Sequence, residues 1–111
     1  MKPKPIIRRA LAELDVQEAV QYYFDQEAPQ AALAFINELE AALEHIQRHP
    51  ATGSPRYAHS LNIPGLRFWR CKRFPYLVFY VEQVDSIDVW RILHGKRDIP
   101  AWLQDDTLSL S

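Results

Sequence analysis

The sequence predicts an α+β domain in the order β-α-α-β-β-β, with a helical hairpin packed on a small antiparallel sheet. Two stretches between residues 10 and 50 carry apolar residues at the spacing of amphipathic helices. After a loop, apolar and polar residues alternate with a period of two, which is typical of strands. The length of 111 residues favours one domain, with residues 1–5 and 104–111 expected as flexible ends.

The first elements are a short strand around residues 6–9 and a helix over residues 11–26. Pro3 and Pro5 keep the start of the strand irregular, because proline has no backbone N–H to donate. The helical spacing i, i+3, i+4, i+7, i+8 predicts one buried face, made of Val16, Ala19, Val20, Tyr23 and Phe24.

The second helix has the strongest pattern in the chain and is expected over residues 30–49, with Pro29 suited to its first turn. Pro50 ends it. Because few residues separate the two helices, they should form an antiparallel hairpin. The apolar stripe of the second helix consists of Ala32, Phe35, Ile36, Leu39, Leu43 and Ile46.

Residues 50–65 are expected to form a loop, and three strands follow at residues 66–73, 76–82 and 87–95. Short turns join these strands into an antiparallel meander. Alternation along the first of them places Arg67 and Arg73 on one face and Arg70 and Lys72 on the other, so these cations do not all line one site. We expect Tyr80 and Trp90 in the core, and the pattern leaves Trp69 open.

Charge is divided unevenly along the chain, although the formal net charge is only −1. Residues 11–50 contain eight acidic residues and one basic residue, whereas residues 51–81 contain five basic residues and no acidic one. A basic face of this kind favours an anionic partner, either nucleic acid or an acidic protein segment.

Several classes of protein are disfavoured. No apolar run approaches the roughly 20 residues of a membrane span, and no secretory apolar segment follows the N-terminus, so a cytoplasmic protein is the simplest interpretation. The single cysteine, Cys71, excludes an intrachain disulfide and a cysteine zinc site. We find no glycine-rich phosphate loop and no HExxH, CxxC or GxSxG motif, and we expect no metal and no cofactor.

The stretch "RILHGKRD", residues 91–98, carries the most promising chemistry. His94 ends a strand; it is either a general base for a ribose 2′-hydroxyl or a strand-end histidine bonded to nearby backbone. Arg97 either holds a phosphate or pairs with Asp98. The strand arginines and Trp102 pose the same choice between an anion-binding surface and structural packing.

Taken in order, the motifs of the chain resemble the ParE/RelE superfamily of type II toxin–antitoxin toxins, and its ParE branch in particular. The resemblance covers about residues 6–103 and rests on "IRRA", "ELDVQEAVQYY", "PQAALAFINELEAAL", "HPATGSPR", "IPGLRFWRCKRFPYLVFYVE" and "IDVWRILHGKRD". It implies the same β-α-α-β-β-β fold and a toxin neutralised by a small antitoxin.

The branch of the superfamily decides the mechanism that the resemblance implies. RelE-like toxins are ribosome-dependent mRNA endonucleases that use sheet arginines and lysines. Arg97 and Arg70 match two of these positions, but the arginine that opens the next strand falls at Leu77, and the catalytic tyrosine has no counterpart near Trp102. ParE-like toxins lack that set and inhibit DNA gyrase by binding, which fits this sequence better.

The leading hypothesis is therefore a ParE-like gyrase inhibitor without enzymatic activity, which forms a hetero-oligomer with its antitoxin. An apolar groove between the helical hairpin and the sheet is expected to take an antitoxin helix or strand. One alternative is a RelE-like endoribonuclease acting on ribosome-bound mRNA, with His94, Arg97 and Arg70 as its site; another is an inactive homologue that binds only its antitoxin. The expected target- or partner-binding residues are Arg67, Arg70, Arg73, Arg91, Arg97 and Trp102.

Overall fold

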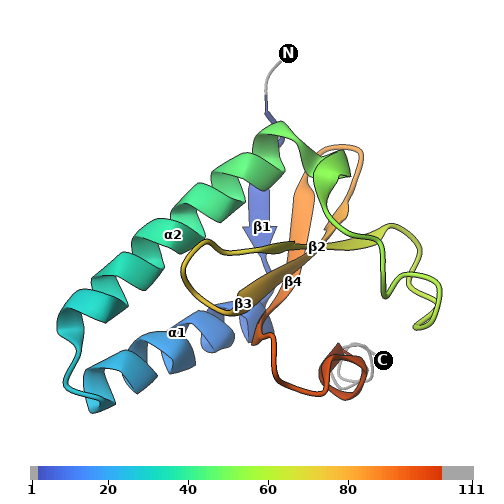
Figure 1. The fold of residues 1–111 in the computed structure, drawn as a ribbon. Coiled ribbons are helices and arrows are strands. Elements are labelled where there is room, and N and C mark those ends of the chain that lie inside the picture. Colours follow the sequence, from blue (N-terminus) through green and yellow to red (C-terminus); the bar gives the residue numbers. More distant parts are fainter. Residues whose placement is uncertain (1–2, 104–111) are drawn as a thin grey trace.

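The computed structural model describes residues 3–103 of the chain. The expectations for residues 1–2 and 104–111 lie outside this range. Two helices cover one face of a four-stranded sheet, and the loop before β2 and the last described residues lie on its other side (Figure 1). The elements are β1 (Ile6–Arg8), α1 (Ala10–Asp25), α2 (Pro29–Arg48), the short 3₁₀ helix η1 (Pro50–Thr52), β2 (Leu66–Arg70), β3 (Tyr76–Glu82) and β4 (Ile87–His94).

The strand order is β1-β4-β3-β2, and β2, β3 and β4 form the predicted antiparallel meander. The α+β class and the order of elements are confirmed. The sheet is mixed rather than purely antiparallel, because β1 pairs in parallel with β4, with Ile6 opposite Ile87 and Arg8 opposite Val89. The hairpin and the meander separate these two strands in the chain, so no tight turn dictates their relative direction.

Strand β2 is shorter than the alternating pattern predicts, because it ends at Arg70. The Cys71 amide donates to the carbonyl of Tyr76 at 3.0 Å. Arg73 lies in the following turn with a φ of 68°, in the left-handed region. The prediction that Arg73 shares a strand face with Arg67 is therefore wrong.

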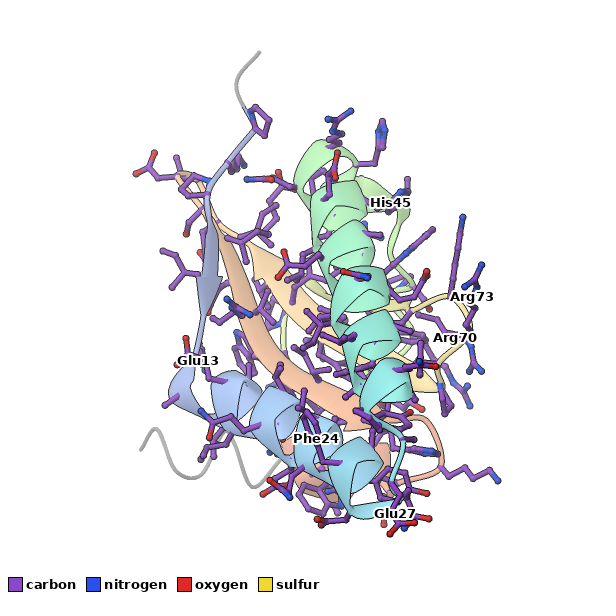
Figure 2. All side chains as sticks on the ribbon, turned by 90° about the vertical axis from the view of Figure 1, so that its left-hand side faces the viewer. Glu13, Phe24, Glu27, His45, Arg70 and Arg73 are labelled. Carbon is purple, nitrogen blue, oxygen red and sulfur yellow. The ribbon has the colours of Figure 1, made fainter. Side chains whose placement is uncertain are left out.

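The buried face of α1 differs from the predicted one at its C-terminal end. Ala12 and Ala19 are buried, but Phe24 is 51% exposed and points away from the sheet (Figure 2). Adjacent helical residues point about 100° apart, and at this end of α1 Tyr23 faces inward while Phe24 faces outward. Tyr23 takes the inner place, packing edge-to-face on Phe74 with ring centroids 5.6 Å apart.

The apolar stripe of α2 is buried as predicted, apart from Ile36, which is half-buried. A stacked pair also holds the helix to the sheet. The ring of Trp69 on β2 lies parallel to that of His45 on α2, with centroids 3.8 Å apart and planes 19° apart. Trp69 is therefore half-buried as part of the helix–sheet contact.

Both faces of the sheet are covered, which makes two separate cores. The helices cover Val78 and Tyr80, and the Tyr80 hydroxyl donates to the Pro50 carbonyl at 2.6 Å, so the prediction of Tyr80 as core is confirmed. On the other face, residues of the 57–63 loop and of the helical residues 99–103 pack over the sheet. The sequence pattern did not predict this C-terminal helical turn. The buried side chains of this second core are Ile63, Leu66, Leu77, Phe79, Val81, Leu93, Ile99 and Leu103.

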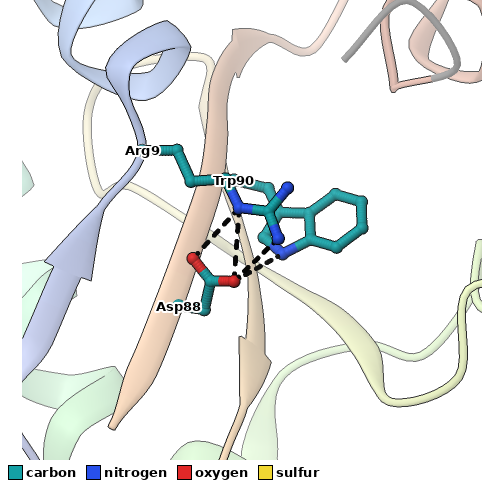
Figure 3. Close-up of polar contacts among 3 residues, drawn as sticks. All are labelled: Arg9, Asp88 and Trp90. Carbon is teal, nitrogen blue, oxygen red and sulfur yellow. Dashed lines mark hydrogen bonds and ion pairs between the residues drawn. The ribbon is translucent and has the colours of Figure 1, made fainter. Parts of the chain in front are cut away.

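An arginine, an aspartate and a tryptophan fix the junction of β1 and α1 to β4 (Figure 3). Arg9 donates to Asp88 through Nε at 3.2 Å and through its terminal nitrogen at 2.9 Å. The Trp90 indole also donates to Asp88, at 3.1 Å, and the Arg9 guanidinium lies 4.0 Å above the Trp90 ring. Trp90 is half-buried in this cluster rather than fully in the core as expected.

Among residues 3–103, no helix is long and apolar enough to cross a membrane.

Candidate functional site

The end of β4 turns sharply and brings several cations together. The Gly95 amide donates to the Pro75 carbonyl at 2.7 Å, and the Arg97 amide donates to the His94 carbonyl at 3.0 Å. A Cβ added to Gly95 would lie 3.8 Å from Nη1 of Arg70, so the Arg70 guanidinium lies beside the same turn. We call the set of Arg70, His94, Lys96 and Arg97 the cationic corner.

The imidazole of His94 has a defined protonation pattern. Its Nδ1 accepts a hydrogen bond from the Lys96 amide at 3.1 Å, so the neutral ring carries its proton on Nε2 and donates from there. Partial burial lowers the pKa of His94 below 6.5, and Lys96, Arg97 and Arg70 lower it further. The sequence is compatible with His94 either as a general base or as a strand-end histidine bonded to nearby backbone. The hydrogen bond from the Lys96 amide to Nδ1 is the bond expected for the strand-end role.

Arg97 and Trp102 form one unit at this corner. The guanidinium of Arg97 lies 4.0 Å from the centre of the Trp102 ring, over its face. Arg97 is exposed and Trp102 is half-buried, so both present surface to solvent. Asp98, the predicted alternative partner of Arg97, instead begins the helical residues 99–103, where its carbonyl accepts from the Trp102 amide at 3.1 Å.

Arg91 lies inside the protein rather than on its surface. It is 4% exposed, and it donates to Asp15 of α1 through Nε at 2.8 Å and Nη2 at 2.7 Å. Asp15 also accepts from the Ile92 amide at 2.9 Å, where β4 extends beyond the end of β1. A third nitrogen of Arg91 donates to the carbonyl of Trp102 at 3.3 Å. Arg91 therefore joins α1, β4 and the C-terminal residues, and it is not available as a binding surface.

Sequence reasoning missed Asp15, which is 6% exposed. The signal was its position on the apolar face of α1, three residues after Ala12 and four before Ala19. An acidic residue at such a position requires a buried partner.

The other two predicted cations are also separated from each other. Arg67 donates to the Gly53 carbonyl at 2.7 Å and holds the loop before β2 against the strand. Arg73 is exposed in the turn between β2 and β3, near Arg70 and on the side of the molecule away from β1 (Figure 2). Of the predicted surface set, the structure thus gathers Arg70, Arg97 and Trp102, with Arg73 in the adjoining turn.

Leu77 is the second residue of β3 and lies opposite Arg70 of β2, but it contributes no charge to the corner. Its side chain is 8% exposed and belongs to the second core with Leu93 and Leu103. The thiol of Cys71 offers no nucleophile either, because burial, with a smaller contribution from Glu38, raises its pKa to about 11. The charged part of the corner is therefore a surface rich in hydrogen-bond donors.

Comparison with known proteins decides the family. Residues 6–99 match the family model described as the ParE toxin of the type II toxin–antitoxin system parDE. The chain belongs to the ParE family. Toxin ParE1 of Caulobacter vibrioides is 31% identical over 105 residues, which cover 93% of this chain and 99% of that protein.

The fold agrees with this assignment. The structure titled as the chromosomal ParDE toxin–antitoxin system from P. aeruginosa superposes with a TM-score of 0.70 at 18% identity. The match covers 84% of this chain and 97% of that one. The resemblance to the ParE branch is thereby confirmed, and the chain is a ParE-type toxin of a type II toxin–antitoxin system.

Proposed function

We propose that this ParE-type toxin inhibits DNA gyrase by binding it, catalyses no reaction itself, and is neutralised by a cognate antitoxin in the cytoplasm. The observation that carries the proposal is the burial of Leu77. RelE-like nucleases, by the resemblance described above, have an arginine at this position. Stabilising a phosphorane needs a positive group aimed at the developing charge, and an apolar side chain held in the core provides none.

The surface proposed to contact gyrase consists of Arg70, Arg73, Arg97 and Trp102. Three of these residues carry a permanent positive charge, and Trp102 adds a half-exposed ring under Arg97. Arginine and tryptophan are the residue types that most often dominate binding energy at protein interfaces. Arg67 and Arg91 are left out of this surface because hydrogen bonds hold them within the fold.

The antitoxin is proposed to dock on the opposite side of the molecule. A groove of about 520 Å³ lies between β1 and α2, with Ile6 and Leu43 as its apolar part. Glu40, Glu44 and Arg48 flank it on α2 and Arg8 flanks it on β1, so charges of both signs surround the apolar residues. A segment with an apolar stripe between charged residues fits this pattern, and the result is a toxin–antitoxin hetero-oligomer.

A gyrase supercoiling assay tests the main proposal. The purified toxin should inhibit supercoiling at micromolar concentration, and the Arg70→Ala/Arg97→Ala variant should require at least about tenfold more protein. Arg48→Ala is the matched control, because Arg48 is an exposed arginine of α2 that lies outside the surface proposed for gyrase and, within residues 3–103, forms an ion pair with Glu44. Full supercoiling with micromolar wild-type toxin would reject the proposal.

One observation favours a second candidate, the ribosome-dependent endoribonuclease. The cationic corner brings together His94, Arg97 and Arg70, the three residues that this alternative requires. In that case ribosome-bound mRNA is cut by the wild type and stays intact with His94→Ala. Uncut mRNA with the wild type rejects this candidate, and a chain that arrests no growth when expressed alone is instead an inactive homologue.

A further inference from the structure

A cleft of about 530 Å³ lies between α1 and the ends of β3 and β4. Its size is within the range of pockets that enclose small molecules. Glu18 and Tyr22 of α1 form one wall, and Tyr76, His94, Lys96 and Arg97 form the other. The cleft thus uses the side of the cationic corner that faces α1.

The polar groups around this cleft are mostly donors that have no protein acceptor. Within residues 3–103, no ion pair holds Lys96 or Arg97, and no hydrogen bond holds the hydroxyls of Tyr22 or Tyr76. His94 presents Nε2–H as a donor, because its Nδ1 already accepts from the backbone. Such a set favours a ligand rich in acceptor oxygens.

The charge balance of the cleft also favours an anion. Asp15 lines the cleft, but both of its carboxylate oxygens accept hydrogen bonds from Arg91, so the charge of Asp15 is neutralised by Arg91. Glu18 is then the one unpaired carboxylate among the described lining residues, against the two permanent cations Lys96 and Arg97. Arg70, beside Gly95, adds a third positive charge nearby.

Aromatic surface is the other component of the cleft. Tyr22 is 55% exposed and is held edge-on by Tyr23, with ring centroids 5.2 Å apart. Across the cleft, Tyr76 packs edge-to-face on His94 with centroids 5.3 Å apart. Both tyrosines are thereby braced by a neighbouring ring, and the exposed face of Tyr22 can stack on a flat ligand ring.

We propose that this cleft binds a phosphate monoester joined through a sugar to a flat ring, the chemistry of a nucleoside monophosphate. The phosphate accepts hydrogen bonds from Lys96, Arg97 and His94, while the ring stacks on Tyr22. Glu18 is left to accept from an amino group of the ring. This inference goes beyond the proposed function, because it requires neither gyrase nor an antitoxin, and it assigns no bond cleavage to the site.

The surroundings favour a single nucleotide over a longer strand. Helix α1 contains Glu13, Asp15, Glu18 and Asp25 and no lysine or arginine. A second phosphate continuing along α1 would therefore meet carboxylates instead of cations. A dianionic phosphate monoester also matches the local excess of cations better than a single carboxylate does.

Titration of the full chain with AMP, adenosine and inorganic phosphate, followed by calorimetry and by NMR shifts of His94, tests the inference. AMP should bind with a dissociation constant below about 1 mM, and each of the other two at least about tenfold more weakly. AMP binding and gyrase inhibition are measured separately, so the two proposals can fail independently. If the chain binds AMP but does not inhibit gyrase, this inference is supported and the proposed function is rejected.

The variants separate the parts of the site. Lys96→Gln/Arg97→Gln should weaken AMP about tenfold or more, and Tyr22→Leu should weaken AMP about fivefold while leaving inorganic phosphate unchanged. Arg48→Ala, an arginine outside the cleft, should bind AMP as the wild type does. No AMP binding by the folded wild type, or equal binding by the Lys96/Arg97 variant, overturns the site. Equal binding of AMP and inorganic phosphate overturns the role of the ring.

Discussion

The buried pair of Asp15 and Arg91 should be the most sensitive polar contact in the protein. Asp15→Ala removes the carboxylate that holds two nitrogens of Arg91 and the Ile92 amide. The arginine would then remain inside the protein without the carboxylate of Asp15. Solvent cannot compensate, because the side chains of the pair are only 5% and 6% exposed.

The expected loss follows from this burial. Removing one partner of a buried ion pair costs about 3–5 kcal/mol, which is a large part of the stability of a small domain. The matched control is Asp88→Ala, since Asp88 also accepts two nitrogens of an arginine, Arg9. That pair is 24% and 18% exposed at its side chains, so solvent screens it and the loss should be about 1–2 kcal/mol.

Urea unfolding of the purified chain measures the difference. With a slope of about 1.5 kcal/mol per molar urea, Asp15→Ala should lower the midpoint by about 2 M or more, and Asp88→Ala by about 1 M. The double change Asp15→Leu/Arg91→Met should lose less than Asp15→Ala alone, because no unpaired charge remains. A loss for Asp15→Ala no greater than for Asp88→Ala would refute this reasoning.

The remaining predictions concern the backbone and the titration of the corner. Arg73→Gly should keep or slightly raise the free energy of unfolding, by up to about 1 kcal/mol, because glycine suits the φ of 68°. The same change should weaken gyrase inhibition, because it removes a cation. Equally weak inhibition by Arg73→Lys, which keeps the charge, would contradict this. Glu27→Gly, at a φ of 54° between the helices, should stabilise the fold for the same reason, and thermal unfolding should show a midpoint no lower than that of the wild type. Gly53→Ala should destabilise by about 2–3 kcal/mol in urea unfolding, because its Cβ would overlap the Tyr80 hydroxyl. His94 should titrate below 6.5 in NMR, so stability from its neutral form is complete above that pH and is lost as the pH falls toward the folded-state pKa; a titration at or above 6.5 would contradict the geometry of the corner.

Local periodicity was enough to predict the helices and the meander, because each pattern arises within one element. The parallel pairing of β1 with β4 was not predictable in this way, since it joins residues 6–8 to residues 87–89. The exposure of Phe24 shows the same limit at smaller scale. Its apolar side chain fits the helical spacing, but at the end of α1 Tyr23 is the ring that packs on Phe74, and Phe24 lies outside.

The candidate site was predictable where it depends on adjacent residues and not where it depends on distant ones. The turn after His94 and the exposure of Arg97 follow from "LHGKR". The burial of Arg91 does not, because it depends on Asp15, 76 residues earlier in the chain. The helical residues 99–103 were also missed, since a stretch as short as residues 99–103 carries no periodic signal.

The central claim is that this toxin acts by binding gyrase through Arg70, Arg73, Arg97 and Trp102 and does not cut RNA. One experiment compares DNA supercoiling by gyrase and the integrity of ribosome-bound mRNA over the same range of toxin concentrations. The account predicts inhibited supercoiling with the wild type and with Arg48→Ala, weaker inhibition with Arg70→Ala/Arg97→Ala, and intact mRNA throughout. Unaffected supercoiling together with cleaved mRNA would contradict it.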